Sequence, residues 1–544
     1  MRRAPRLTRR NPAALCLVLF VSLTVLETWP LATNPAHLSR NDNADTMLNE
    51  WVIAWVAHQA VHDPRHLFQA NIFYPERNTL AFSESMLVQS AFAAPLLWAG
   101  ASPVLTYNLV LMAGFTLTGW AMCMVVARWT GDWPAGIGAG ILMAFSSHAL
   151  ARLPHLQAQH IEFLPFVLLS LNALLDRPRL RHAIALAVCF ALHSLTSYYL
   201  FVMTSLGLVA AVLARPGSWR GPLRRSVWAY LALAALLSAV LLLPALLPYW
   251  KVSQEGFARS VIGVRQASWR SYLGTVSRFD YWLLAPWGDN NLFPGFCGLA
   301  LTTYLIGRGA LRNPTVRMCL AFGACGVGLS FGSSLPGFDV LYALFLPLRG
   351  IRGMDRFGYL GIVAVAAASG FAIADLRRRV AGATAGAMVG TGILLVLVLE
   401  TLPVRIDYLP FTGVPRIYHF LDSERAAVVA DLPLAPHSAI AKNADLMLNS
   451  TVSFYRLLNG YSGFIPQSYL DHYDALADFP SPATIAALRA IGVTHVFVHV
   501  DAYPRAAIDW LRSSPGVRQM GTPDGPILLF ELVPRSPAPT DRAG

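Results

Sequence analysis

Two stretches of this chain lack charged residues over lengths that no ordinary soluble fold uses. Ser85–Ala127 contains no Asp, Glu, Lys or Arg, and His182–Ala214 is equally uncharged between flanking arginines. A single helix needs about 20 apolar residues to cross a bilayer. The 544 residues are 55% hydrophobic and 13% charged, whereas soluble domains average about 45–50% and about 25%. A soluble enzyme, a disordered chain and a coiled coil are therefore excluded, and a polytopic α-helical membrane protein is predicted.

The net charge of +12 comes from short knots of arginine between the apolar runs, as at Arg177–Arg181 and Arg377–Arg379. A nucleic-acid-binding protein instead carries a continuous basic patch or stripe, so nucleic acid is excluded as a partner. Arginine knots beside apolar spans mark the cytoplasmic side of a membrane protein. The six cysteines have no CxxC spacing, which argues against a disulfide framework and a thiolate metal site.

Placing every basic knot in the cytoplasm gives about 11 transmembrane helices, with the amino terminus inside a bacterial inner membrane and the carboxyl terminus outside. Leu87–Gly100 is interpreted as a short helix in the outer leaflet. In the alternative threading, this segment spans the membrane and a later run does not. The predicted spans are 13–30, 103–127, 134–151, 158–175, two within 182–214 that turn near Ser197, 227–250, 293–307, 318–334, 357–374 and 381–400.

The composition changes near Pro403 to that of a soluble domain. Short apolar or alternating runs predict strands at 426–432, 493–500 and 527–532. Ser481-Pro482 before a helical run and Gly492 after it predict a capped helix, and 504–513 predicts another. We therefore expect a multi-span domain, 1–402, with a large outer loop at 31–85, followed by an extracytoplasmic α/β domain at 403–535 and a disordered tail at 536–544.

The first outer loop carries an acidic motif, Asn41-Asp42-Asn43-Ala44-Asp45, followed by an apolar-periodic run at Leu48–Ala60. The run predicts an amphipathic helix lying on the membrane. Asp42 and Asp45 are candidates to deprotonate a hydroxyl group or to hold a divalent cation. In the alternative interpretation, Asp45 caps a helix that starts at Thr46. Glu84, at the end of this loop, is either a supporting base or a solvated helix end.

A second polar group lies where the threading places the external turn between the third and fourth spans. Two readings stay open: a pocket for a phosphate or a sugar, and simple loop polarity. The histidine spacing matches no zinc motif, so no metal site is assigned here. The group comprises His148, Arg152, His155, Gln157, His160 and Glu162.

Three arginines, Arg349, Arg352 and Arg356, precede the tenth predicted span on the outer side. Guanidinium groups bind phosphate through paired, charge-assisted hydrogen bonds. Their position opposes the positive-inside bias, which favours a role in binding a lipid phosphate; the alternative is pairing with Asp355 or with the soluble domain.

Histidines elsewhere in the chain receive structural interpretations. His193, within an apolar run, is expected to be a hydrogen-bonded packing residue. The spans carry few of the intramembrane charges that ion-coupled transporters use, so transport is disfavoured. His495 and His499 are expected to be surface residues.

With these parts together, the layout resembles the GT-C class of integral-membrane glycosyltransferases. The blocks that carry the narrower similarity, to a group of bacterial membrane proteins loosely assigned to that class, are Ala70-Asn-Ile-Phe-Tyr-Pro75, His155-Leu-Gln157, Leu348-Arg-Gly-Ile-Arg352 and Asn459-Gly-Tyr-Ser-Gly463. The resemblance implies polyprenyl-phosphate-linked sugars as donors and places Asp45, then Asp42, at the class's catalytic acidic positions. The class usually has an adjacent acidic pair, whereas Asn43 and Ala44 separate the two residues here.

The leading hypothesis is thus an inverting glycosyltransferase that acts at the outer face of a bacterial inner membrane on an envelope glycan, lipid or protein acceptor. Asp45 or Asp42 would act on the acceptor hydroxyl, and Arg349, Arg352 and Arg356 would bind the donor phosphate. Glu84, Arg152, His155, Gln157 and His160 would line the pocket. The cofactor is open, with a divalent cation as one candidate. The alternative is a non-enzymatic membrane factor for the translocation or assembly of envelope lipid or polysaccharide.

Overall fold

The computed structural model describes residues 11–255, 264–421 and 427–533, so the first arginine knot and the predicted tail at 536–544 lie outside the described residues. The described chain forms two compact units. The first unit contains residues 11–40, 86–92 and 107–408, and the second contains 41–85, 93–106 and 409–533. We describe each unit separately.

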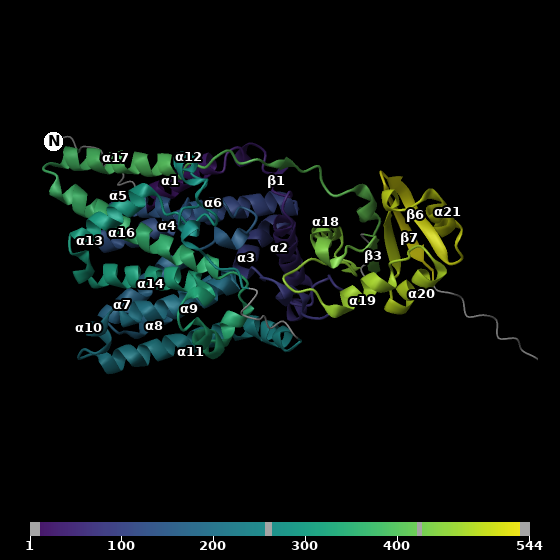
Figure 1. Ribbon diagram of the computed structural model, residues 1–544, viewed down its shortest axis with the longest axis horizontal. Helices are drawn as coiled ribbons and strands as arrows, with labels where there is room; N and C mark the ends of the chain where they lie inside the picture. The colour runs from purple at the N-terminus through teal and green to yellow at the C-terminus, as the bar shows by residue number, and fades with distance from the viewer. Residues whose placement is uncertain (1–10, 256–263, 422–426, 534–544) are drawn as a thin grey trace, which may run out of the picture. The chain divides into compact units, whose positions relative to one another are not determined.

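The first unit is helical, and its long helices lie roughly side by side (Figure 1). Small residues allow two of the central helices to approach closely. A Cβ atom on Gly323 would collide with Cβ of Ala364, and one on Gly326 would lie 2.5 Å from Cβ of Leu360. The main helices are α1 (Pro12–Glu27), α4 (Pro103–Thr130), α5 (Trp133–Ala144), α7 (Phe163–Asp176), α8 (Leu180–Thr196), α9 (Tyr198–Leu213), α11 (Arg224–Gln254), α13 (Phe296–Gly307), α14 (Pro314–Ser330), α16 (Tyr359–Arg379) and α17 (Ala383–Thr401).

Five helical segments of the described chain are long and apolar enough to cross a membrane: Pro103–Thr130, Leu156–Asp176, Arg224–Gln254, Met354–Arg379 and Ala383–Thr401. Shorter apolar helices of 10–17 residues accompany them, α1, α8, α9, α13 and α14 among them. The chain is therefore a helical membrane protein. The count of eleven crossings and the orientation remain predictions.

Two helix boundaries bear directly on the functional site. The expected turn near Ser197 is confirmed, because Ser197 ends α8 and its side chain accepts a hydrogen bond from the backbone N–H of Tyr199 at 3.1 Å. The predicted span at 134–151 is wrong at its carboxyl end. Helix α5 stops at Ala144, and Ser146 caps a separate short helix, α6 (Ser147–Leu150). His148 therefore lies outside α5.

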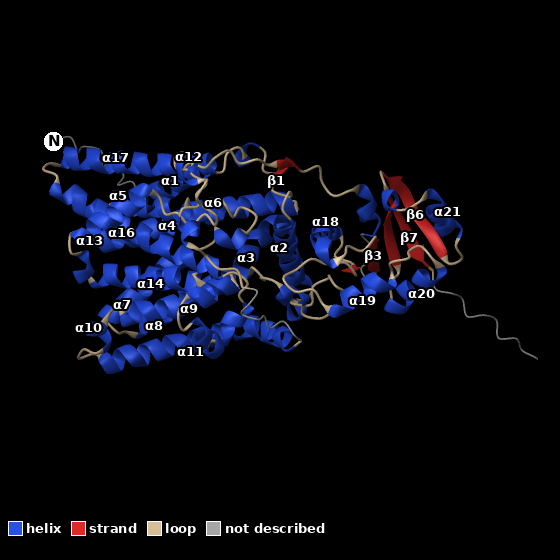
Figure 2. Cartoon of the chain, viewed as in Figure 1, coloured by secondary structure: helices blue, strands red, loops and turns tan. Residues whose placement is uncertain are grey.

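The second unit contains a β-sheet, whose strands are red in Figure 2. The sheet has five strands in the order β4-β3-β5-β7-β6. The strands β3, β4 and β5 are parallel to one another, and β7 runs antiparallel to β5 and β6. The strand bounds are β3 (Val428–Leu432), β4 (Arg456–Leu457), β5 (His495–His499), β6 (Val517–Asp524) and β7 (Ile527–Leu532). The helices of this carboxyl-terminal part are α18 (Asn443–Asn449), α19 (Gln467–Ala475), α20 (Pro482–Ile491) and α21 (Arg505–Ser513).

Several of these elements match the sequence-based expectations. Strands are present within 427–432, 493–500 and 527–532, while residue 426 lies outside the described residues. Helix α20 begins with a capping box at Ser481 and ends at Gly492, whose φ of 96° is left-handed and therefore suits glycine. Strands β4 and β6 were not predicted: β4 has only two residues, and β6 has a polar sequence without alternation.

A segment of the first loop pairs with the edge of this sheet. The backbone N–H of Leu457 donates to the carbonyl of Asn71 at 2.6 Å, and that of Tyr74 donates to the carbonyl of Leu457 at 3.0 Å. The backbone N–H of Phe73 also donates to the carbonyl of Asn459 at 3.1 Å. The unpaired edge of β4 is thus covered, as an exposed sheet edge requires. Residues 41–85 therefore fold with the carboxyl-terminal sheet, although the domain division near residue 403 stays a prediction.

Helix α2 (Ala44–His62) corrects two expectations for the acidic loop. Every residue from Leu48 to Ala57 is buried, so α2 is not an amphipathic helix on the membrane surface. The residue that caps α2 is Asn43, whose side chain accepts from the backbone N–H of Asp45 at 2.9 Å. Asp45 thus lies in the first turn, where a carboxylate is favoured by the helix dipole.

We predict that Asn71→Ala destabilises the second unit by roughly 2–4 kcal/mol, because a buried amide with three partners is lost. Its oxygen accepts from the indole of Trp51 at 3.0 Å, and its nitrogen donates to the hydroxyl of Ser450 at 3.1 Å and to the carbonyl of Tyr455 at 2.9 Å. Thermal unfolding of the detergent-solubilised chain measures the effect. Gln467→Ala, which removes an exposed amide of α19, is the control. Equal melting temperatures for the two variants would contradict the prediction.

Candidate functional site

The turn after α6 is organised by the buried side chain of Gln159. Its amide nitrogen donates to the carbonyl of Ala149 at 2.8 Å and to that of Arg152 at 3.0 Å. The hydroxyl of Thr118 donates to the carbonyl of Gln159 at 2.7 Å. These bonds close the turn between α6 and α7 and fix the backbone around Arg152.

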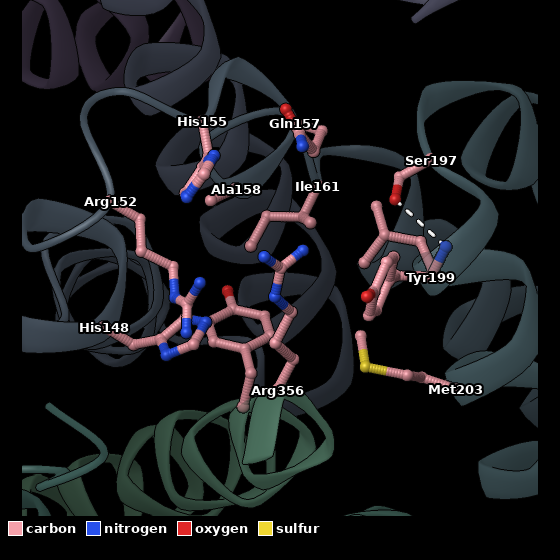
Figure 3. Close-up of a pocket in the computed structure, with 12 residues that line it drawn as sticks. His148, Arg152, His155, Gln157, Ala158, Ile161, Ser197, Tyr199, Met203 and Arg356 are labelled. Atoms are coloured by element: carbon pink, nitrogen blue, oxygen red, sulfur yellow. Dashed lines mark hydrogen bonds between the residues drawn. The ribbon is translucent and has the colours of Figure 1, made fainter. Parts of the chain in front are cut away.

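This turn forms part of the wall of a cavity in the first unit (Figure 3). Figure 3 shows the side chains of Arg152 and Arg356 entering the cavity from different parts of its wall. The rest of the wall comes from the start of α9 and from residues next to α16. The polar residues that line the cavity are His148, Arg152, His155, Gln157, Ser197, Tyr199, Arg356 and Tyr359.

Two tyrosines at the start of α9 hold the segment Leu346–Arg356, here called the arginine-rich segment, against the cavity. The hydroxyl of Tyr198 donates to the carbonyl of Pro347 at 3.1 Å, and the backbone N–H of Arg352 donates to the hydroxyl oxygen of Tyr199 at 2.8 Å. The guanidinium carbon of Arg356 lies 4.4 Å from the ring centroid of Tyr199, a cation–π contact. The carboxyl-terminal half of the segment is thereby oriented toward the cavity.

The three predicted arginines have different environments. Only Arg356 lines the cavity, whereas Arg349 and Arg352 are exposed. A guanidinium nitrogen of Arg349 donates to the carbonyl of Ala343 at 3.4 Å. The structure brings one of the three, Arg356, to a cavity that it shares with Arg152 from the distant turn, and not Arg349 or Arg352.

In the described part of the chain, Asp355 forms ion pairs with two other arginines and not with these three. Its carboxylate lies 3.6 Å from a guanidinium nitrogen of Arg152 and 3.1 Å from Nε of Arg265. Arg265 was not singled out from the sequence, since it stands alone in a loop and belongs to no motif. Tyr199 was missed because an aromatic residue in an apolar run gives no signal of its own.

The electrostatics of the cavity favour an anion. Burial, with a further contribution from nearby Arg356, lowers the pKa of Arg152 to about 9. Arg152 is nevertheless a cation at neutral pH. Burial, followed by Arg152 and Arg356, also lowers the pKa of His148 well below its usual value, so its imidazole is neutral. Two guanidinium groups beside neutral hydrogen-bonding side chains are suited to a phosphate.

His160, Glu162 and Glu84 do not line this cavity. His160 is buried behind the turn, with Nδ1 3.1 Å from a carboxylate oxygen of Glu162 and Nε2 2.8 Å from the carbonyl oxygen of Val110. Its role is therefore in packing, and its assignment to the pocket was wrong. Glu84 belongs to the second unit, between a short helical turn that ends at Phe82 and helix α3 (Leu87–Trp98).

The candidate acid–base residues lie in the second unit. A carboxylate oxygen of Asp45 accepts a hydrogen bond from the hydroxyl of Tyr461 at 2.9 Å. Asp42, just before the helix, is exposed. The contact with Tyr461 links the acidic motif to the Asn459–Gly463 segment, a partnership that the sequence did not reveal.

The Asn459–Gly463 segment is itself fixed by buried contacts. The side chain of Asn459 exchanges hydrogen bonds of 2.9 and 2.8 Å with the backbone of Asp431. Gly460 packs flat against Phe73, where an added Cβ would lie 2.7 Å from the ring. Glycine is required at this position for space. The residues on either side of Gly460 are thereby kept aligned with the first loop.

The remaining histidine assignments have mixed outcomes. His193 is buried, with Nε2 3.0 Å from the hydroxyl of Thr204, which confirms the packing interpretation. His495 is buried rather than on the surface. His499 lies 2.8 Å from the buried carboxylate of Asp431. Within the described residues, no group of three or more His, Cys, Asp or Glu side chains is arranged to hold a metal ion.

Comparison with known proteins gives a result at the level of the fold. No protein-family model and no curated protein matches the sequence. The structure of arabinofuranosyltransferase AftD from mycobacteria aligns with a TM-score of 0.55 and 16% identity, over 96% of this chain and 40% of AftD. The archaeal oligosaccharyltransferase AglB from Archaeoglobus fulgidus, in complex with an inhibitory peptide and a dolichol-phosphate, aligns with a TM-score of 0.50 and 12% identity, over 90% and 69% of the two chains.

Both of these proteins are GT-C glycosyltransferases. The chain has a GT-C-like fold. The expected resemblance is therefore confirmed for the architecture, while the chain spans only 40% of the length of AftD. In this GT-C-like chain, the cavity around Arg152 and the acidic residue Asp45 are the two places with candidate chemistry.

The fully buried Glu50 of α2 gives a pH-dependent prediction. Burial raises the pKa of Glu50 to about 8; nearby Asp445 also raises it, and Asn41 opposes the change. In the unfolded chain this carboxyl group ionises near its ordinary value of about 4.3. The free energy of unfolding should therefore fall as pH rises from about 4.5 to 8, by about 1.4 kcal/mol per pH unit at most.

Glu50→Gln removes this titration and should flatten the dependence, making the chain more stable than wild type above pH 8. Melting temperatures recorded from pH 5 to 9 test the prediction. Asp478→Asn removes an exposed carboxylate and should keep the wild-type slope. A slope that is unchanged in Glu50→Gln would show that the carboxyl group does not carry it.

Proposed function

We propose that the chain is a membrane glycosyltransferase that transfers a sugar from a polyprenyl-phosphate donor to an envelope glycan, lipid or protein acceptor at the outer face of the inner membrane. The observation that carries the proposal is the cavity where Arg152 and Arg356 meet beside Tyr199. Two guanidinium groups in a partly buried setting attract an anionic ligand. A GT-C-like fold with a phosphate-binding cavity is suited to a lipid-phosphate donor.

The arginines would act on the leaving group. When the acceptor oxygen attacks the anomeric carbon, the bond between that carbon and the phosphate oxygen breaks, and the phosphate keeps the electron pair. Negative charge on the phosphate therefore grows in the transition state. Fixed cations that face this charge lower the barrier, because they need no reorganisation at the moment of reaction. The solved AglB complex contains a dolichol-phosphate, which agrees with a donor of this class.

Asp45 is the first candidate for the base, and Asp42 the second. The base would take the proton of the acceptor hydroxyl as the new glycosidic bond forms, which gives inversion at the anomeric carbon. Tyr461 donates to a carboxylate oxygen of Asp45 at 2.9 Å and would orient the carboxylate for this role. The sheet of the second unit, which pairs with Asn71–Tyr74 of the first loop, would then hold the loop that carries Asp45 in place. A divalent cation remains a candidate cofactor.

The test is mass spectrometry of membrane lipids from cells that lack the protein and are complemented with single variants. Arg152→Ala and Asp45→Asn should both leave the donor lipid at the elevated level of the deletion, at roughly tenfold or more above wild type, because each loses an interaction made in the transition state. Arg349→Ala is the matched control. It removes an exposed arginine from the segment that carries Arg356 and should restore the wild-type level.

Three outcomes are informative. Loss of transfer in both variants with normal protein abundance supports the enzyme. Full complementation by Asp45→Asn, Asp42→Asn and the double variant would contradict a catalytic role for the acidic motif. A lipid pool that changes in the deletion but in none of the point variants would instead favour a non-enzymatic factor for envelope assembly.

A further inference from the structure

One carboxylate behind the cavity has no place in the mechanism above. Asp355 is 1% exposed and immediately precedes Arg356 in the sequence. Its carboxylate faces Arg152 at 3.6 Å and Arg265 at 3.1 Å. A buried carboxylate is costly unless cations or hydrogen bonds compensate it. The carboxylate of Asp355 is thus an internal anion close to the guanidinium group of Arg152. The same guanidinium group lines the cavity.

The two ion pairs differ in their geometry. Neither contact is a hydrogen bond, because within the described residues both carboxylate oxygens of Asp355 lack a hydrogen-bond partner. The ion pair with Arg265, at 3.1 Å, is nevertheless closer than the one with Arg152, at 3.6 Å. Arg152 is also largely buried, while the side chain of Arg265 is 55% exposed. The Arg152 contact is therefore the one that an external anion can replace, because the phosphate would offer shorter, paired hydrogen bonds.

The backbone around Arg265 fixes this arrangement. The N–H of Arg265 donates to the carbonyl of Arg352 at 2.8 Å, and the N–H of Met354 donates to the carbonyl of Arg265 at 2.7 Å. The N–H of Ala267 donates to the carbonyl of Ser330 at 2.8 Å, which attaches the backbone segment around Arg265 to the end of α14. Arg265 is thus held next to the arginine-rich segment by the main chain and not only by its side chain.

Gly353 provides the space that the carboxylate occupies. A Cβ atom at this position would lie 2.5 Å from a carboxylate oxygen of Asp355. The φ of Gly353 is −136°, which any residue adopts. Glycine is therefore needed here for space and not for backbone conformation, and a side chain would displace the carboxylate.

We propose that Asp355 is an internal counter-anion of the phosphate cavity, which holds Arg152 while no lipid phosphate is bound and competes with the phosphate for it. This proposal rests on the proposed function, because it assumes that a lipid phosphate enters the cavity. Asp355 acts through Arg152 and is a positioning residue that sets how tightly the phosphate, and after transfer the product lipid phosphate, is held. Arg265 has the opposite effect, since it draws Asp355 away from Arg152.

The experiment measures binding of undecaprenyl phosphate to the full chain in lipid nanodiscs by native mass spectrometry. Asp355→Asn should lower the dissociation constant by about tenfold, because one buried negative charge near the phosphate is removed. Arg265→Ala should raise it by several-fold, because Asp355 then pairs with Arg152 alone. Asp339→Asn removes an exposed carboxylate of the helix at Phe338–Leu344 and should leave the constant within about twofold.

Asp355→Asn and Arg265→Ala should change the dissociation constant in opposite directions. A merely structural role does not give this result, because loss of structure weakens binding in both variants. Asp355→Glu, which keeps the charge, should bind like wild type if it folds, as checked by its melting temperature. Weaker or unchanged binding in a folded Asp355→Asn overturns the proposal. If Arg152→Ala binds undecaprenyl phosphate as well as wild type does, the phosphate assignment of the cavity itself fails, whatever the behaviour of Asp355.

Discussion

The meeting of Arg152 and Arg356 in one partly buried cavity is the constraint on which the rest of the site depends. Like charges at close range repel, and the desolvation of a guanidinium group adds to the cost. The structure compensates with the aromatic face of Tyr199 under Arg356 and the carboxylate of Asp355 near Arg152. Neutral His148 completes the wall without adding a third positive charge. The positive charge that these groups leave uncompensated makes the cavity suited to a phosphate.

The breaks between helices place the residues of this cavity. Helix α5 ends at Ala144, and the chain then turns through α6 so that Arg152 and His155 reach the cavity. If the helix continued to residue 151, as the hydropathy suggests, these side chains would point in different directions around the helix axis. They would then not face one cavity. The break at Ser197 between α8 and α9 likewise places Tyr199 at a helix start. In the second unit, the pairing of Asn71–Tyr74 with β4 brings Tyr461 to Asp45 in the same way.

The sequence was sufficient for features that depend on local patterns. The long apolar helices, the turn at Ser197 and the capped helix α20 all follow from hydropathy, turn and capping chemistry. It was also sufficient to nominate the turn containing Arg152 and the segment containing Arg356, because charge is rare in so apolar a chain. It could not pair them, since the two residues lie some two hundred positions apart and nothing in the sequence encodes their contact.

The failures have the same origin. His160 and Arg152 are equally polar in the sequence, and only the fold decides that one faces a backbone carbonyl and the other a cavity. Leu48–Ala60 has the spacing of a surface helix, yet α18 packs against α2 and every residue from Leu48 to Ala57 is buried. Tertiary contacts between distant segments therefore determine the candidate site, while local chemistry determines the elements that carry it.

The most direct test of the central claim is an experimental structure of the full chain in lipid nanodiscs with undecaprenyl phosphate added. The account predicts density for the phosphate between the guanidinium groups of Arg152 and Arg356, with the hydroxyl of Tyr199 close by. Density for the phosphate at Arg349 and Arg352 instead, or an unchanged cavity at a saturating concentration of the lipid, would contradict it.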